Sequence, residues 1–174
     1  MKLESLAFDQ AQLDVFRRQL MEHDRELLVR RLEAAGARVA ELAASVSEEA
    51  AASDGWNARE VLAHVAVLSK FYGVAAKQVA AGAWAEIDLL AFVNQRDVAG
   101  EATARLPVGE IAAMAAADNR RTVEFLRNAE VESLYRRASI GEGVSWSAEE
   151  IVRLALCAHL ELHLEQLARA LGGP

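Results

Sequence analysis

The sequence has few cysteine, proline and β-branched residues, and each of these shortages excludes a structural feature. One cysteine, Cys157, among 174 residues excludes an internal disulfide and fits a reducing compartment. Only two prolines are present, and alanine and leucine dominate the composition. The β-branched residues seldom alternate with polar ones, so we expect no sheet and an all-α protein.

The chain also lacks the long apolar run of a membrane protein and the basic patch of a nucleic-acid-binding protein. No window reaches the roughly 18 uninterrupted apolar residues of a membrane helix, and the start "MKLESLAFDQ" has no signal-peptide layout. The net charge is −7 and basic residues are scattered among acids, which argues against phosphate contacts. We therefore expect one cytoplasmic domain, residues 1–174, that binds neither membrane nor nucleic acid.

Hydrophobic periodicity predicts four long helices. They cover residues 9–44, 56–82, 108–128 and 147–171, with a loop at 45–56 and a shorter helix at 87–97. Gly36 and the charged stretch at residues 21–28 leave a bend or break in the first helix open. Four long helices without a strand predict a four-helix bundle, which commonly builds its sites from side chains that project inward.

Two of these helices begin with the same signal. Asn57 and Glu60 form a capping box in "WNARE", and Ser147 and Glu150 form another in "WSAEE". In each box the first side chain accepts a hydrogen bond from a free N–H of the helix, and the glutamate reaches back to the cap. The boxes therefore predict where the second and the last helix start.

The histidines are the unusual feature of these two helices. His159 and His163 lie four residues apart in "ALCAHLELHLEQLARAL", and at about 100° per residue both fall near the middle of the apolar arc. His64 falls on the inward face of the second helix. Because a spacing of four places two rings over one point, as in helical metal sites, the three rings are predicted to converge.

Three histidines supply three neutral nitrogen ligands and leave a further position open, as in catalytic zinc sites. The spacing does not select the metal: zinc or nickel is our first expectation, and iron, cobalt or manganese is compatible. Gln166 faces inward and is predicted to orient a ligand or a substrate, whereas Glu161 falls on the charged side and is a poor general base. The alternative interpretation is a hydrogen-bonded core cluster, or a site that has lost its metal.

The phrases "GWNAREVLAHVAVLSKFY" and "WSAEEIVRLALCAHLELHLEQLARAL" resemble the DinB-like (YfiT-like) superfamily over residues 28–171. Among its branches the chain is most similar to the N-terminal domain of mycothiol-dependent maleylpyruvate isomerase. The stretch "DLLAFVNQRDVAG" resembles that branch's middle segment, including an asparagine, here Asn94, which becomes a candidate substrate contact. The resemblance implies an up-down-down-up four-helix bundle, often dimeric, with a metal triad of His64, His159 and His163.

Characterised members of that family transfer low-molecular-weight thiols, use them as cofactors, or hydrolyse their substrates. The resemblance therefore implies a homodimeric, metal-dependent thiol transferase or isomerase that acts on a small molecule and uses a thiol such as mycothiol. One alternative is a metal-dependent hydrolase. The other is a non-catalytic dimeric bundle that binds or sequesters a small molecule and keeps a vestigial metal site. Residues 1–20 have no clear family counterpart and would cap the bundle or support the dimer.

Overall fold

The computed structural model describes residues 9–49 and 56–172, most of which are helical. The element order is α1 (Gln10–Ala43), α2 (Ala58–Ala80), α3 (Leu89–Thr103), α4 (Val108–Asn128), η1 (Val131–Tyr135), β1 (Arg137–Gly141), β2 (Val144–Ser147), α5 (Ala148–Glu150), η2 (Ile151–Ala158) and α6 (His159–Ala170). The predicted all-α class is confirmed at this level. Within the described ranges, no helix combines the length and the apolarity that crossing a bilayer requires.

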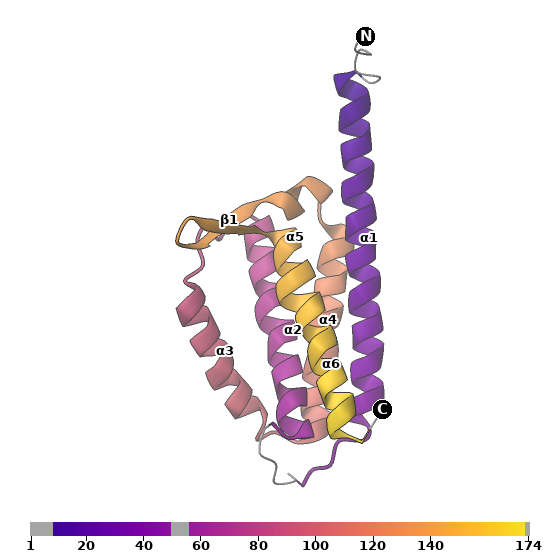
Figure 1. Cartoon of the computed structure of the whole chain (residues 1–174), viewed down its shortest axis with the longest axis vertical. Coiled ribbons are helices and arrows are strands. Elements are labelled where there is room, and N and C mark those ends of the chain that lie inside the picture. The colour runs from indigo at the N-terminus through magenta and orange to yellow at the C-terminus, as the bar shows by residue number, and fades with distance from the viewer. Residues whose placement is uncertain (1–8, 50–55, 173–174) are drawn as a thin grey trace, which may run out of the picture.

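The long helices share one hydrophobic core. Figure 1 shows α1, α2, α4 and α6 side by side, with α3 packed against α2 from outside. In the same view α1 and α6 run in one direction, and α2 and α4 run in the other. Because α2 contacts α3, α4, η2 and α6, every residue from 61 to 69 is buried. A polar side chain in this part of α2, such as His64, is therefore largely withdrawn from solvent.

Helix α1 is continuous, so Gly36 produces no break. A Cβ added at Gly36 would lie 3.1 Å from Oδ1 of Asn119 on α4. The amide of Asn119 donates to the Leu32 carbonyl at 3.0 Å, so the glycine provides room for a polar contact between the two helices.

The N-terminal part of α1 extends beyond the other helices (Figure 1), and its Leu13 and Leu20 are 38% and 62% exposed.

The expectation of no strand was wrong, because β1 and β2 form an antiparallel hairpin. Its two-residue turn, Glu142 and Gly143, has φ values of 51° and 75°, as hairpin turns of type I′ require. The strands are too short to show clear alternation, so the signal in the sequence was the turn "GEG" alone. Ser139 of β1 also accepts a hydrogen bond from the Ile87 N–H at 2.8 Å, which anchors the segment before α3.

The last helix begins at the predicted capping box of Ser147 and Glu150 but is not a uniform α-helix. Its η2 part is π-helical, and a π-helix turns less per residue than an α-helix. A wheel drawn at one angle therefore misplaced the residues of α6. The buried face of α6 is formed by Leu160, Leu164 and Leu167, while Leu162 is 57% exposed.

The remaining predicted bounds agree with the structure within a few residues, apart from α3. That helix runs to Thr103, beyond the predicted end at residue 97. The second capping box, Asn57 with Glu60, is present at the start of α2. Parts of the predicted loop (50–55), of the N-terminal segment (1–8) and of the glycine–proline end (173–174) lie outside the described residues.

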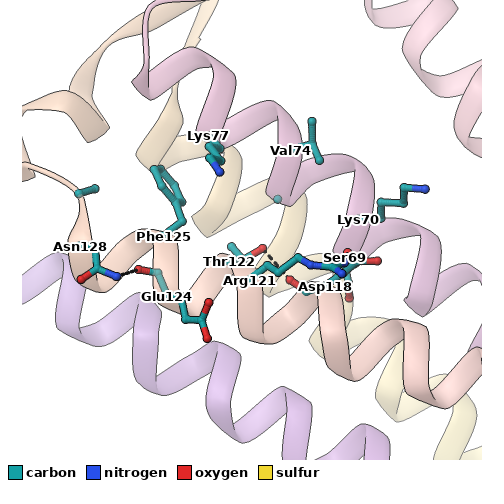
Figure 2. Close-up of a pocket in the computed structure, with 12 residues that line it drawn as sticks. Ser69, Lys70, Val74, Lys77, Asp118, Arg121, Thr122, Glu124, Phe125 and Asn128 are labelled. Atoms are coloured by element: carbon teal, nitrogen blue, oxygen red, sulfur yellow. Dashed lines mark hydrogen bonds and ion pairs between the residues drawn. The ribbon is translucent and has the colours of Figure 1, made fainter.

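We predict that Gly73→Ala destabilises the protein, because α2 and α4 touch at this glycine. A Cβ added there would lie 2.3 Å from the Thr122 hydroxyl oxygen, which donates to the Asp118 carbonyl (Figure 2). The free energy of unfolding should fall by about 1–2 kcal/mol, as measured by chemical denaturation. Gly100→Ala is the control: it lies inside α3 with nothing within 4 Å, so it should raise stability by about 0.5–1 kcal/mol. Equal gains from both changes would contradict the prediction.

Candidate metal centre

The three predicted histidines converge between α2 and α6. One ring nitrogen from each of His64, His159 and His163 lies within 4.8 Å of the other two. The ring centroids are 4.5 Å apart for His64 and His163, 4.8 Å for His159 and His163, and 5.7 Å for His64 and His159. The predicted convergence is therefore confirmed, and the rings are close enough to share one metal ion.

The uniform wheel placed His64 correctly but not the two rings of the last helix. His64 is buried, whereas His159 and His163 are half-buried on the flank of α6. The π-helical η2 precedes them and changes the rotation of the chain between the two parts of the last helix. The two rings of α6 are therefore partly open to solvent, while His64 borders a cleft.

Burial keeps the imidazoles uncharged. Burial, followed by the charges of His163 and Arg96, lowers the pKa of His64 from 6.5 to about 3. Burial is also the largest cause that lowers the pKa of His159 and the pKa of His163. A neutral imidazole retains a lone pair on one ring nitrogen, which is the form that binds a metal.

Hydrogen bonds to the remaining ring nitrogens orient the imidazoles. Nδ1 of His163 lies 2.9 Å from Oε1 of Gln166. Because an amide oxygen only accepts, Nδ1 carries the proton and Nε2 carries the lone pair. His159 bonds in the same way to the backbone carbonyl of Ala155. Gln166 thus lies where a partner that orients a metal ligand is usually found.

The donor set fits a divalent ion. Nitrogens bound to one zinc ion at about 2.0–2.1 Å lie about 3.3 Å apart in tetrahedral geometry. The histidine nitrogens, at no more than 4.8 Å from one another, need to approach by at most about 1.5 Å, which small side-chain rotations supply. Three neutral nitrogens that leave a fourth position free match a catalytic site better than a closed structural one.

A cleft of about 760 Å³ opens beside His64. Trp56, which directly precedes α2, is half exposed and stands over the rings, with centroids 4.7 Å from His64 and 6.0 Å from His163. Asp97, Gly100 and other residues of α3 form the opposite wall. The dimensions suit a small molecule held against the histidines.

Two functional residues on α3 were missed by the sequence analysis. The Arg96 guanidinium donates to the Tyr72 hydroxyl at 3.1 Å and to one carboxylate oxygen of Asp97 at 2.8 and 3.0 Å. Tyr72 in turn lies beside His159, with ring centroids 6.4 Å apart. An arginine followed by an aspartate does not by itself indicate a functional site. Arg96 and Asp97 lie near the histidines only because α3 packs against α2.

Asn94, the other predicted contact on α3, is not brought into the cluster. It is exposed and does not line the cleft. Of its neighbours on the same helix, Asp97 lines the cleft, and the charges of Arg96 and Asp97 both act on the pKa of His64. The resemblance in this segment therefore selected the correct helix but not the residues that reach the site.

The nearest carboxylate in sequence and the single thiol both point away from the cluster. Glu161 makes a bidentate ion pair with Arg31 of α1 at 2.8 and 2.7 Å, and that bond lowers the pKa of the carboxyl group. Cys157 is buried, and burial raises the pKa of its thiol to about 12. Glu161 is thus confirmed to face away from the histidines, and Cys157 is a core residue instead of a nucleophile.

A second hollow lies between α2 and α4, and it lacks the features of a catalytic site. Its volume is about 490 Å³, and Figure 2 shows Lys70, Lys77 and Arg121 around it together with Asp118 and Glu124. None of the three histidines lines it. Arg121 is already paired with Asp118 at 2.5 Å. These exposed charges of both signs are typical of a solvated helix surface.

Comparisons of the chain with known protein families, with curated proteins and with solved structures found no match. The candidate site is therefore described by its own geometry alone.

We predict that the metal-free protein loses stability as the pH falls below about 6.5. Unfolded histidines take up protons near a pKa of about 6.5, whereas folded His64 stays neutral down to a pKa of about 3. The unfolded state then binds more protons, so unfolding becomes easier across that range, by at most about 1.4 kcal/mol per pH unit for each such group.

Urea denaturation between pH 7.5 and pH 5 measures the effect, and about 1.5 of these pH units lie below the pKa of unfolded histidine. His64→Phe should flatten the dependence of stability on pH, and His23→Gln, at an exposed position on α1, should leave it steep. A His64→Phe protein with the native slope would show that this ring does not titrate as its burial implies.

Proposed function

We propose that the protein is a metal-dependent enzyme of the DinB-like kind, with one divalent ion held by His64, His159 and His163. The observation that carries this proposal is the approach of three ring nitrogens to within 4.8 Å of one another. It is supported by the low pKa values of the three histidines, which keep the donors neutral. Zinc or nickel suits three imidazoles, and iron, cobalt or manganese is compatible.

The helix directions support the proposed family topology. The family's four-helix bundle runs up-down-down-up, and in this chain α1 and α6 run opposite to α2 and α4 (Figure 1). The helices α2 and α4 are parallel, and the long connection between them contains α3. This arrangement places the histidine of α2 opposite those of α6, as the resemblance implies.

A small-molecule thiol transfer or isomerisation is the reaction that we propose for this site. A divalent ion bound there would supply Lewis acidity and would lower the pKa of a coordinated thiol or water. The protein's own thiol is unsuitable because Cys157 is buried with a raised pKa, so the thiol would come from a small cofactor such as mycothiol. Trp56 and the α3 wall would hold the reactants against the histidines and exclude water.

Metal analysis tests the proposal directly. Purified native protein equilibrated with zinc or nickel should retain about one ion per chain, because three neutral imidazoles converge on one point. His159→Ala should lose at least about 10-fold in affinity while its helical circular dichroism and thermal unfolding stay close to native. A fluorescent chelator competition measures both affinities.

His23→Ala is the matched control, because His23 is exposed on α1. It should bind the metal as the native protein does. Native protein that binds no metal, or a His159→Ala variant with unchanged affinity, would overturn the proposal. Metal binding without turnover in a screen of thiol and hydrolytic substrates would instead favour the sequestration alternative.

We also propose that the protein is a homodimer formed through the projecting part of α1. Leu13 and Leu20 are seven residues apart, share one face and are exposed. If two copies pair antiparallel with Leu20 at the two-fold axis, Arg18 of each copy, which is exposed and pairs with Glu132 of its own chain, lies opposite Glu22 of the other. The apolar face and the opposite charges therefore match a second copy of the same helix.

Leu20→Glu should convert the dimer to a monomer, since it places a charge in the proposed contact without touching the core. Val15→Glu is the control: Val15 is 55% exposed on a different side of α1, so this variant should remain dimeric. Sedimentation velocity measures the mass of each. Native protein that sediments as a monomer, or identical behaviour of the two variants, would contradict this arrangement.

A further inference from the structure

Trp56 places a half-exposed indole beside the histidine cluster. Its ring centroid lies 4.7 Å from that of His64 and 6.0 Å from that of His163, and the planes of the last pair are 25° apart. The residue is 50% exposed and lines the cleft of about 760 Å³. The capping box at this helix start uses Asn57 and Glu60, so capping does not account for the indole. An exposed aromatic surface next to a candidate site indicates that it binds a ligand there.

The opposite wall of the cleft, formed by α3, has small residues at its centre. Gly100 and Ala104 lie one turn apart on α3, and both line the cleft. A Cβ added at Gly100 would meet nothing within 4 Å, so the space beside this residue is open. An indole on one wall and small residues on the other leave a slot between them, and a slot of this kind suits a flat ring.

Several polar side chains of the cleft are already bonded within the protein. Arg59 donates to two backbone carbonyls at 2.7 and 2.5 Å, and Glu60 accepts an N–H in the capping box. Asp97 accepts two bonds from the neighbouring arginine. Glu101 and Arg105 are exposed and lie four residues apart on α3, where opposite charges attract each other. The indole is therefore the feature of this cleft best suited to select a ligand.

We propose that Trp56 determines the specificity of the site, and that the substrate carries a flat aromatic ring held between the indole and Gly100 of α3. This inference rests on the proposed function, because the metal ion would bind the polar substituent next to the ring. His64 lines the same cleft, so a ring in the slot lies beside the cluster and its substituent can reach the ion. Stacking on an indole favours a flat ring over a puckered ring of similar size.

Binding of two thiols to the cobalt-loaded protein tests the proposal. Phenylmethanethiol and cyclohexylmethanethiol present the same CH₂–SH group and are similar in size, but only the first has a flat ring. Burial of apolar surface alone would favour the cyclohexyl ring, which is the more apolar of the two. The visible spectrum of the bound cobalt reports thiol binding, and native protein should bind phenylmethanethiol about 2- to 12-fold more tightly. Trp56→Ala should abolish this preference, whereas Trp56→Phe, which retains an aromatic face, should keep at least about half of it.

Leu90→Ala is the matched control, because Leu90 is 72% exposed on α3 and does not line the cleft. It should keep the preference for phenylmethanethiol. Gly100→Leu tests the slot from its other wall: the added side chain should weaken the binding of phenylmethanethiol while the affinity for cobalt stays native.

Equal binding of the two thiols by native protein, or an unchanged preference in Trp56→Ala, would overturn the inference while metal binding stands. A purely structural Trp56 would give the second result, with a loss of stability alone. Where Trp56→Ala does not fold, Gly100→Leu decides, and unchanged phenylmethanethiol binding in that variant would overturn the inference. Native protein that takes up no cobalt would instead overturn the proposed function.

Discussion

Three uncharged imidazoles packed against one another are the constraint on which the rest of the site depends. A proton on any one of them would place a charge beside the other two rings and beside the Arg96 guanidinium, in a place where burial already penalises charge. Burial therefore favours the neutral state of all three rings. It leaves three lone pairs facing a common point, and the chemistry available to the site follows from those lone pairs.

Elements far from the rings are needed to hold them in this arrangement. The box of Ser147 and Glu150 sets where the last helix begins, and the π-helical η2 sets its rotation before His159. The bidentate pair of Arg31 and Glu161 ties α6 to α1, and its charge faces away from the cluster. These contacts fix where the last helix begins, how it is rotated and how it lies against α1. The two rings of α6 are therefore directed to one side of it, toward His64.

The sequence predicted what local patterns encode and missed what packing decides. The helices, both capping boxes and the pairing of His159 with His163 follow from spacing within single segments, whereas the approach of His64 was predicted from its inward face and from the family resemblance. The flank position of His159 and His163 could not be predicted, because no residue of η2 signals a π-helix. The hairpin was missed since its strands are short, and Arg96 was missed because its neighbours in space, Tyr72 and the histidines, belong to other helices.

The absence of a carboxylate among the three ligand side chains determines what kind of chemistry the proposed centre would support. In a site with a carboxylate ligand, part of the charge of the ion is cancelled by the protein, and its power to polarise a ligand is reduced. Here Asp97 is paired with Arg96 and Glu161 with Arg31, and Glu60 and Glu101 line the cleft beside His64. Three neutral ligands would therefore leave the full charge of the ion to polarise whatever binds to it. An anionic thiol would be bound most strongly by that charge, so at this centre recognition and activation would be the same event.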